Sequence, residues 1–319
     1  MGAIKPTLMR TSAIAGAVVW TVMLFLRTSA SPETELINKI LVLGILVIVP
    51  LGLSLVSTPD RNNLHALPYR LAVLAQPFGA ICGFASFFLE QGWPAAALAA
   101  AWFVVTCAIA LFGLWRLLPR GLRPIEEVSI DAGLIFLPVG GVWFMMSRLG
   151  IQPIGFGDTI VLLTAVHFHF AGYAAPILAG LAGRTIGRQG SARKLLGVGV
   201  VSIVTGIWFV AAGITLAPRL ALAGAIVIST GLVLLAVIVV ACVLPSLRSR
   251  TAQILLLVSS ISSTFAMCLA CAYAYSIVTK TVILDIPQMA MAHGIVNAFG
   301  FALCGLVGWS MVEVHGGRP

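Results

Sequence analysis

The chain has 319 residues, of which 60% are hydrophobic and only 9% are charged, and its mean hydropathy is +1.08. Soluble domains usually carry about 25% charged residues, so this chain has too little polar surface to cover a water-soluble globule. The net charge of +9 does not indicate nucleic-acid binding, because the basic residues fall in short loops between apolar runs and form no stripe. The composition predicts an integral membrane protein that is solvated mostly by lipid.

Ten apolar runs follow one another along the chain, each able to cross a bilayer core of about 30 Å. The first run follows Lys5 and Arg10, and Thr28–Ala30 resembles a signal-peptide cleavage site, but we count this run as a spanning helix. Pro, Gly and charged residues gather in the short connections. The sequence therefore predicts an all-α, polytopic bundle that forms one integral membrane domain over residues 1–319. The predicted spans are 13–28, 36–57, 68–89, 94–115, 128–147, 158–182, 195–217, 220–244, 253–278 and 288–312.

The basic residues of alternate loops predict the orientation of the bundle. With the N-terminus in the cytoplasm, eleven basic residues fall on the cytoplasmic side and five on the opposite side, as the positive-inside rule requires. We therefore expect both termini in the cytoplasm. The cytoplasmic set is Arg61, Arg70, Arg116, Arg120, Arg123, Arg184, Arg188, Arg193, Lys194, Arg248 and Arg250, and the opposite set is Arg27, Lys39, Arg148, Arg219 and Lys280.

Intramembrane polar residues are costly in lipid and are therefore the best clues to function. His167 and His169 lie near the middle of the sixth span. Residues two apart on a regular helix point in opposite directions, so one histidine can face a central site while the other faces a neighbouring helix. In the tenth span, His293 and Asn297 lie four residues apart and share one face. Both groups reach a similar depth from the outer side, so we expect them to meet.

Asp131 lies one turn inside the fifth span, on the face of Glu127. Its depth from the cytoplasmic side places it apart from the histidines. We include it among the candidate catalytic residues His167, His169, His293 and Asn297 as a group that assists them or sets a pKa. Gln76 and several aromatic side chains near these positions are candidate substrate contacts. The predicted substrate-binding residues are Gln76, Trp143, Phe168, Phe170, Tyr173, Phe299 and Phe301.

Two patches of the sequence carry a resemblance to a known family: residues 167–172, which read HFHFAG, and residues 293–301, which read HGIVNAFGF. With the all-helical layout, they resemble the YndJ-like family of bacterial membrane proteins. The resemblance implies a multi-pass protein, which we place in the bacterial cytoplasmic (inner) membrane. It implies no settled reaction or ligand, but it marks His167, His169, His293 and Asn297 as candidate site residues.

Three functions fit these residues. The first is a cofactor-free intramembrane enzyme that uses acid–base chemistry for isomerisation, cyclisation or epoxide opening of a lipophilic, terpenoid-like or polyketide-like molecule. The second is a small-solute or proton-coupled transporter, because ten helices can form two inverted halves, although no similarity between the halves is visible. The third is a haem or metal protein, since imidazole is a common ligand. We favour the enzyme. We expect its partners to be the bilayer and a lipophilic small molecule, and we expect it to bind neither a metal nor nucleic acid.

Overall fold

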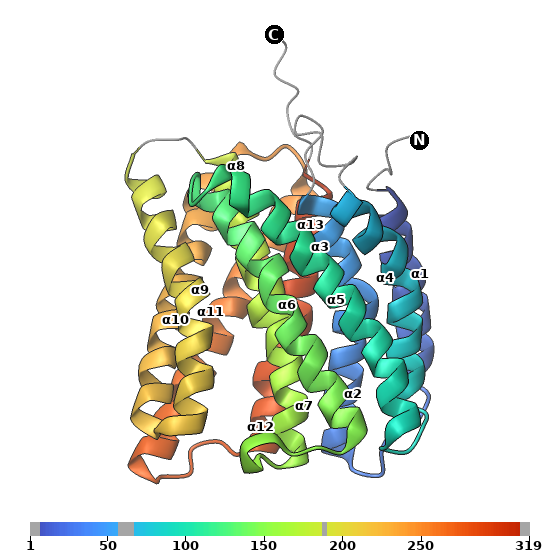
Figure 1. Cartoon of the computed structure of the whole chain (residues 1–319). Helices are drawn as coiled ribbons and strands as arrows, with labels where there is room; N and C mark the ends of the chain where they lie inside the picture. The colour runs from blue at the N-terminus through green and yellow to red at the C-terminus, as the bar shows by residue number, and fades with distance from the viewer. Residues whose placement is uncertain (1–6, 57–66, 187–189, 313–319) are drawn as a thin grey trace.

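The computed structural model describes residues 7–56, 67–186 and 190–312 as helices joined by short connections (Figure 1). Eight of its continuous helices are long and apolar enough to cross a membrane. Two more helices of the described residues, α1 and α4, are not among these eight. Counted with them, they match the ten helices that the hydropathy predicts. The spans are α1 (Thr7–Met23), α2–η1–α3 (Pro32–Leu43, Gly44–Ile48, Val49–Val56), α4 (Leu67–Ser86), α5 (Trp93–Arg120), α6 (Ile125–Leu149), α7–η5–α8 (Asp158–His167, Phe168–Ala174, Ala175–Thr185), α9 (Ser191–Leu216), α10–η6–η7 (Pro218–Ile238, Val239–Val243, Leu244–Ser246), α11 (Arg250–Thr279) and α12–η8–η9–α13 (Ile286–Met289, Ala290–Gly294, Val296–Leu303, Cys304–Ser310).

The ten spans run alternately up and down, so α1 begins and α13 ends at the same end of the bundle (Figure 1). The helix ends at this end carry most of the described basic residues that the loop analysis assigns to the cytoplasm, among them Arg120, Arg193 and Arg250. We call this end the basic face and the opposite end the outer face. Arg61 and Arg188 belong to the same predicted set but lie outside the described residues.

The second span, α2–η1–α3, occupies the centre of the bundle. Its most apolar window is 89% buried inside the protein, against 33% for α9, for α11 and for the last span. Helices α4, α5 and α6 pack side by side along one flank, and α9, α10 and α11 along the other (Figure 1). The sixth and tenth spans lie between these flanks, and both of them contact the second span. The two patches with candidate histidines therefore belong to spans that pack against the central one.

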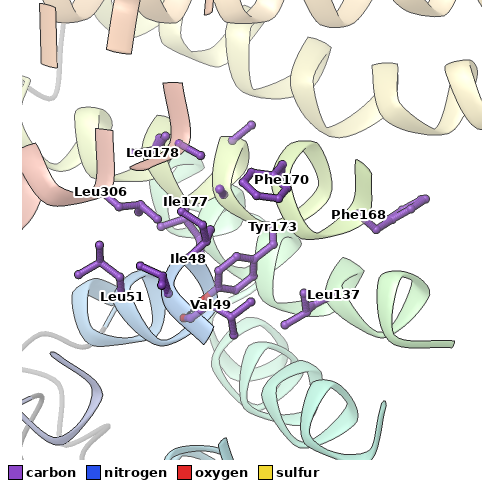
Figure 2. Packing of buried hydrophobic residues seen from close by; sticks show 14 of the residues in the cluster. Ile48, Val49, Leu51, Leu137, Phe168, Phe170, Tyr173, Ile177, Leu178 and Leu306 are labelled. Carbon is purple, nitrogen blue, oxygen red and sulfur yellow. Dashed lines mark hydrogen bonds between the residues drawn. The ribbon is translucent and has the colours of Figure 1, made fainter. Parts of the chain in front are cut away.

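Three of these central spans depart from the α-helix at the places where they meet. The π-helical segments η1, η5 and η9 contact one another, although they come from the second, sixth and tenth spans. A methyl group added at Gly44 of η1 would lie 3.3 Å from the Cβ atom of His169 and from the ring of Phe170, so glycine permits this close approach. Single π-helical turns are rare and often lie at functional sites. Figure 2 shows Phe170 and Tyr173 of η5 beside Ile48 and Val49 of the second span.

Polar side chains from neighbouring helices bind backbone carbonyls in and beside these π-helical segments. Gln76 donates to the carbonyl of Ile45 (3.4 Å), Tyr173 to that of Val49 (2.7 Å) and Ser259 to that of Phe301 (2.8 Å). A carbonyl without a partner is costly in the bilayer core, because no water is available there. These three side chains therefore stabilise the irregular backbone at the centre of the bundle.

Candidate functional site

His169 is fully buried and lies against α5 and α6. Its Nδ1 lies 2.8 Å from the carbonyl oxygen of Ala165, one turn back on its own span, and its Nε2 accepts a hydrogen bond of 2.9 Å from the indole Nε1 of Trp102. A methyl group at Gly140 would approach the imidazole Nδ1 to 2.7 Å, so the ring fills the available space. Both ring nitrogens are occupied, which makes His169 a packing and hydrogen-bonding residue in this arrangement.

His167 points to the other side of the sixth span, where it meets His293 of the tenth. The two ring centroids are 6.5 Å apart and the ring planes differ by 26°. The structure thus brings together His167, His293 and Asn297, as the depths along the spans predict, and separates them from His169. The divergence follows from the two-residue spacing, because side chains at i and i+2 lie on opposite sides of a helix.

The hydrogen bonds to backbone carbonyls fix the tautomers of both histidines in this pair. His167 Nδ1 lies 2.7 Å from the carbonyl oxygen of Leu163, and His293 Nδ1 lies 2.9 Å from that of Ala266 in α11. A carbonyl oxygen can only accept, so each neutral imidazole carries its proton on Nδ1 and presents the lone pair of Nε2. The orientation of both rings is therefore set by the backbone of neighbouring turns.

The two Nε2 atoms differ in their surroundings. Asn297 Nδ2 lies 3.2 Å from Nε2 of His293 and also donates to the carbonyl oxygen of His293 at 3.0 Å. His167 is exposed, and within the described part of the chain no side chain or backbone group bonds to its Nε2. Of the three intramembrane imidazoles, His167 alone presents a free basic nitrogen in the described structure.

Asp131 belongs to a cluster of ion pairs near the basic face. Its carboxylate contacts the Nε of Arg116 at 2.8 Å and a guanidinium nitrogen of Arg120. Glu127 pairs with Arg116 (2.6 Å) and with Arg184 (2.8 Å). We call these five residues the charge cluster. Asp131 therefore lies apart from the histidine pair, and its immediate contacts are those of a structural ion pair.

Arg116 and Arg184 of the charge cluster also bind the C-terminal end of α3. They donate to the carbonyl oxygen of Val56 at 2.9 Å and 3.0 Å, and Arg184 donates to that of Leu55 at 3.2 Å. The last carbonyls of a helix have no partner within the helix, so these arginines cap α3. The charge cluster ties the central span to α5, α6 and α8.

Most of the predicted substrate contacts are core residues in the structure. Gln76 bridges two elements, since it accepts from the hydroxyl of Ser12 at 2.8 Å in addition to its bond to η1. Trp143 is half-buried and packs on Phe156, and Phe299 is half-buried and packs on Trp20 with ring centroids 5.4 Å apart. Figure 2 shows Phe168, Phe170 and Tyr173 within the apolar packing of the centre. Buried side chains in this arrangement are Gln76, Phe168, Phe170, Tyr173 and Phe301.

A metal would find few ligands at the histidine pair. Within residues 7–56, 67–186 and 190–312, no group of three or more His, Cys, Asp or Glu side chains gathers closely enough to hold a metal ion. Cys271 instead lies 3.2 Å from the hydroxyl of Ser229, as a packing thiol between α10 and α11.

Sequence reasoning missed two features that shape the site. The first is Trp102, which occupies the Nε2 of His169 and so distinguishes it from His167. The second is the set of π-helical segments. In the sequence, only glycines such as Gly44, Gly172 and Gly300 mark these segments. Hydropathy predicts neither feature, because it contains no information on the direction of a side chain or on a local change of helical pitch.

The family model described as YndJ-like protein matches residues 39–301. The chain belongs to the YndJ-like family. The match includes the third to ninth spans and most of the second and tenth, so the histidine pair, His169 and the charge cluster all lie inside the YndJ-like region.

A relative from Bacillus subtilis (strain 168), which bears the name uncharacterized membrane protein YndJ, is 34% identical over 212 residues. This stretch is 66% of the chain and 38% of the relative, so the chain spans well under half of that protein's length. No solved structure matches the chain. In this YndJ-like chain, the described residues form a polytopic bundle of helices.

Proposed function

We propose that this YndJ-like chain is an intramembrane enzyme that transfers protons to and from a lipophilic substrate. The observation that carries the proposal is the free Nε2 of His167, on a ring oriented by the carbonyl of Leu163 and exposed beside His293. A neutral imidazole with a free nitrogen can take a proton near neutral pH and return it. Isomerisation needs only that a proton is removed at one atom and returned at another. Cyclisation and epoxide opening also need a nucleophile, which a second group of the same substrate molecule can supply while the imidazole moves the proton.

His293 and Asn297 supply the second wall of the proposed site. His293 is fixed at both nitrogens, by the carbonyl of Ala266 and by the amide of Asn297. Because both of its nitrogens are occupied, its role is to hold the dipoles of this wall in a fixed direction beside His167. Fixed dipoles of this kind act more strongly in a low-dielectric site than in water. His169, which is bonded at both nitrogens and buried, supports the sixth span in this scheme and does not contact the substrate.

The position of the pair suits a substrate that enters from lipid. His167 lies about three turns from the outer end of α7, and His293 lies about two turns from the start of α12. Exposed apolar side chains flank His293 on its own span: Met291 is 57% exposed and Ile295 is 37% exposed. A lipophilic molecule can therefore approach sideways. We place the protein in the bacterial cytoplasmic membrane, with the basic face towards the cytoplasm, because of the loop charges.

The proposal is tested by an untargeted search for products. Membranes that contain the wild-type chain, His167→Gln or the control Arg219→Gln are incubated with a bacterial lipid extract, and lipophilic products are compared by mass spectrometry. Arg219 is exposed at the outer end of α10, far along the chain from the histidines. We expect a product from the wild type and from Arg219→Gln, and a loss of about 100-fold or more in His167→Gln.

Two results would contradict the enzyme. The first is full product formation by His167→Gln. The second is gradient-dependent movement of a solute into proteoliposomes that hold the purified chain, without any chemical product. The second result would favour the transporter, for which ionisable groups inside the membrane are also typical.

A further inference from the structure

A pocket of about 480 Å³ opens at the outer face, between the end of α11 and the start of α12. It is lined by residues of α11, such as Tyr273 and Ser276, by the connection that follows, and by the first residues of α12. Its volume is within the usual range of small-molecule sites, about 300–1,000 Å³. His167, His293 and Asn297 do not line this pocket, so it is a separate candidate binding site.

The two helices that form this pocket also frame the histidine pair. His293 lies seven residues after Ile286 of the pocket and binds the carbonyl of Ala266, which lies seven residues before Tyr273. Seven residues of helix are about 10 Å long. The pocket therefore lies about 10 Å from His293 along both helices, at the end where the spans leave the membrane.

The charged groups that line the pocket are one cation and one anion. Lys280 is exposed and has no ion-pair partner among the described residues. Asp285 accepts a hydrogen bond from the backbone of Gln288 through Oδ1, while Oδ2 has no bond within the described structure. The ring of Tyr273 lines the same pocket, and an aromatic ring can attract an organic cation. This combination suits a ligand that carries both a negative and a positive charge.

The backbone at Lys280 points to a use for its side chain. Lys280 ends α11 in the left-handed conformation, with φ 57°, a position that glycine or asparagine usually occupies. A lysine anywhere in the last turn would serve the helix dipole equally well. At this position Lys280 is one of the residues that line the pocket.

The edge of the pocket carries exposed apolar side chains. Val282, which lines the pocket, is 89% exposed, and its chain neighbour Ile283 is 50% exposed, on the connection between two spans. In water such side chains would be unfavourable, whereas at the membrane interface they can pack on acyl chains. A ligand at this position is therefore met at the level of lipid headgroups.

We infer that this pocket binds the headgroup of a zwitterionic amphiphile, with its phosphate at Lys280 and its ammonium at Asp285 and Tyr273. The amphiphile's apolar part then extends along α11 and α12 towards His293. The binding site stands without the proposed enzyme, whereas its assignment to the substrate rests on the proposed function. The substrate of the enzyme would then be a phosphate-bearing and ammonium-bearing lipid, for which phosphatidylethanolamine is the natural probe.

The test measures lipid retained by the full chain. Wild type, Lys280→Met, Asp285→Asn and the control Arg219→Met are purified in detergent with equal amounts of phosphatidylethanolamine and phosphatidylglycerol, and bound lipid is counted by native mass spectrometry. Asn is also a good N-cap residue, so Asp285→Asn removes charge and leaves the start of α12 capped. Arg219 carries the same charge as Lys280 and is exposed at the same face, outside the pocket.

We expect the wild type and Arg219→Met to retain phosphatidylethanolamine in preference to phosphatidylglycerol. Each pocket variant should lose about threefold to tenfold in retention, as expected for single exposed charge contacts. Free phosphoethanolamine at the same concentration should compete poorly, because it lacks the chains that pack on the rim. Equal retention by all four proteins, no preference between the lipids, or equal competition by the free headgroup would each overturn the inference.

The same preparations separate this inference from the proposed enzyme. His167→Gln should retain phosphatidylethanolamine like the wild type, because His167 lies outside the pocket. If the pocket variants lose lipid while no product forms in any membrane, the headgroup site holds and the enzyme does not. If product forms and depends on His167 but lipid retention is insensitive to Lys280 and Asp285, the enzyme holds with a different substrate.

Discussion

The charge cluster and the histidine pair are both polar regions inside an apolar bundle, but they differ in how completely their groups are bound. In the charge cluster, Asp131 contacts two arginines and Glu127 contacts two. At the histidine pair, the Nε2 of His167 is left free in the described structure. A polar group is costly in lipid, so both regions are expected to have a role. The partners of each group indicate whether that role is structural or chemical. Groups whose partners satisfy them hold the fold, and a group left open is available for chemistry.

The largest effect on stability is expected from Asp131→Ala. The substitution leaves Arg116 buried with one of its two carboxylates missing, and breaking a buried ion pair costs about 3–5 kcal/mol. The free energy of unfolding can be measured by titrating the purified protein with SDS. Asp158→Ala is the control, because Asp158 is exposed near the outer face and should change little. If Asp131→Ala lowers the free energy of unfolding no more than Asp158→Ala does, the charge cluster does not stabilise the fold.

Trp102→Phe should have the next largest effect. The phenyl ring cannot donate, so Nε2 of His169 would be buried without a partner, at a cost of about 1–2 kcal/mol. Trp115→Phe on the same helix is the matched control, since Trp115 is 42% exposed. If both substitutions have the same effect on unfolding by SDS, the indole of Trp102 does not hold His169.

A smaller effect is expected from Ser259→Ala. Its hydroxyl binds the carbonyl of Phe301 in the π-helical segment η9, whereas the hydroxyl of Ser260 bonds within its own helix, to Leu256. Hydrogen bonds between membrane helices contribute about 0.6 kcal/mol on average, so Ser259→Ala should destabilise by about that amount and Ser260→Ala by less. Unfolding by SDS compares the two. Equal effects would mean that the π-helical carbonyl needs no partner from α11.

The number of spans and the depth of the histidines could be predicted because both depend on length and hydropathy alone. Ten apolar runs became ten spans, and similar depths brought His167 to His293. The direction of each side chain could not be predicted, because it depends on which helix lies beside it. Trp102 lies 67 residues before His169 and donates a hydrogen bond to it, and Arg116 of the preceding helix pairs with Asp131. The sequence shows that polar residues are present, but their partners become visible only in three dimensions.

The smallest effect on stability is expected from the residue with the largest expected role in the reaction. His167 is exposed, and its one described hydrogen bond goes to Leu163, one turn back on its own helix. Removing such a bond should change the free energy of unfolding by no more than about 0.5 kcal/mol. His167→Gln should therefore unfold at the same SDS concentration as the wild type. Product formation should nevertheless fall, because glutamine cannot take up the proton. A loss of stability as large as that of Trp102→Phe would instead make His167 a second structural histidine. Unchanged folding with lost product is the combination that a free basic nitrogen predicts, since such a nitrogen contributes to the reaction and not to the packing.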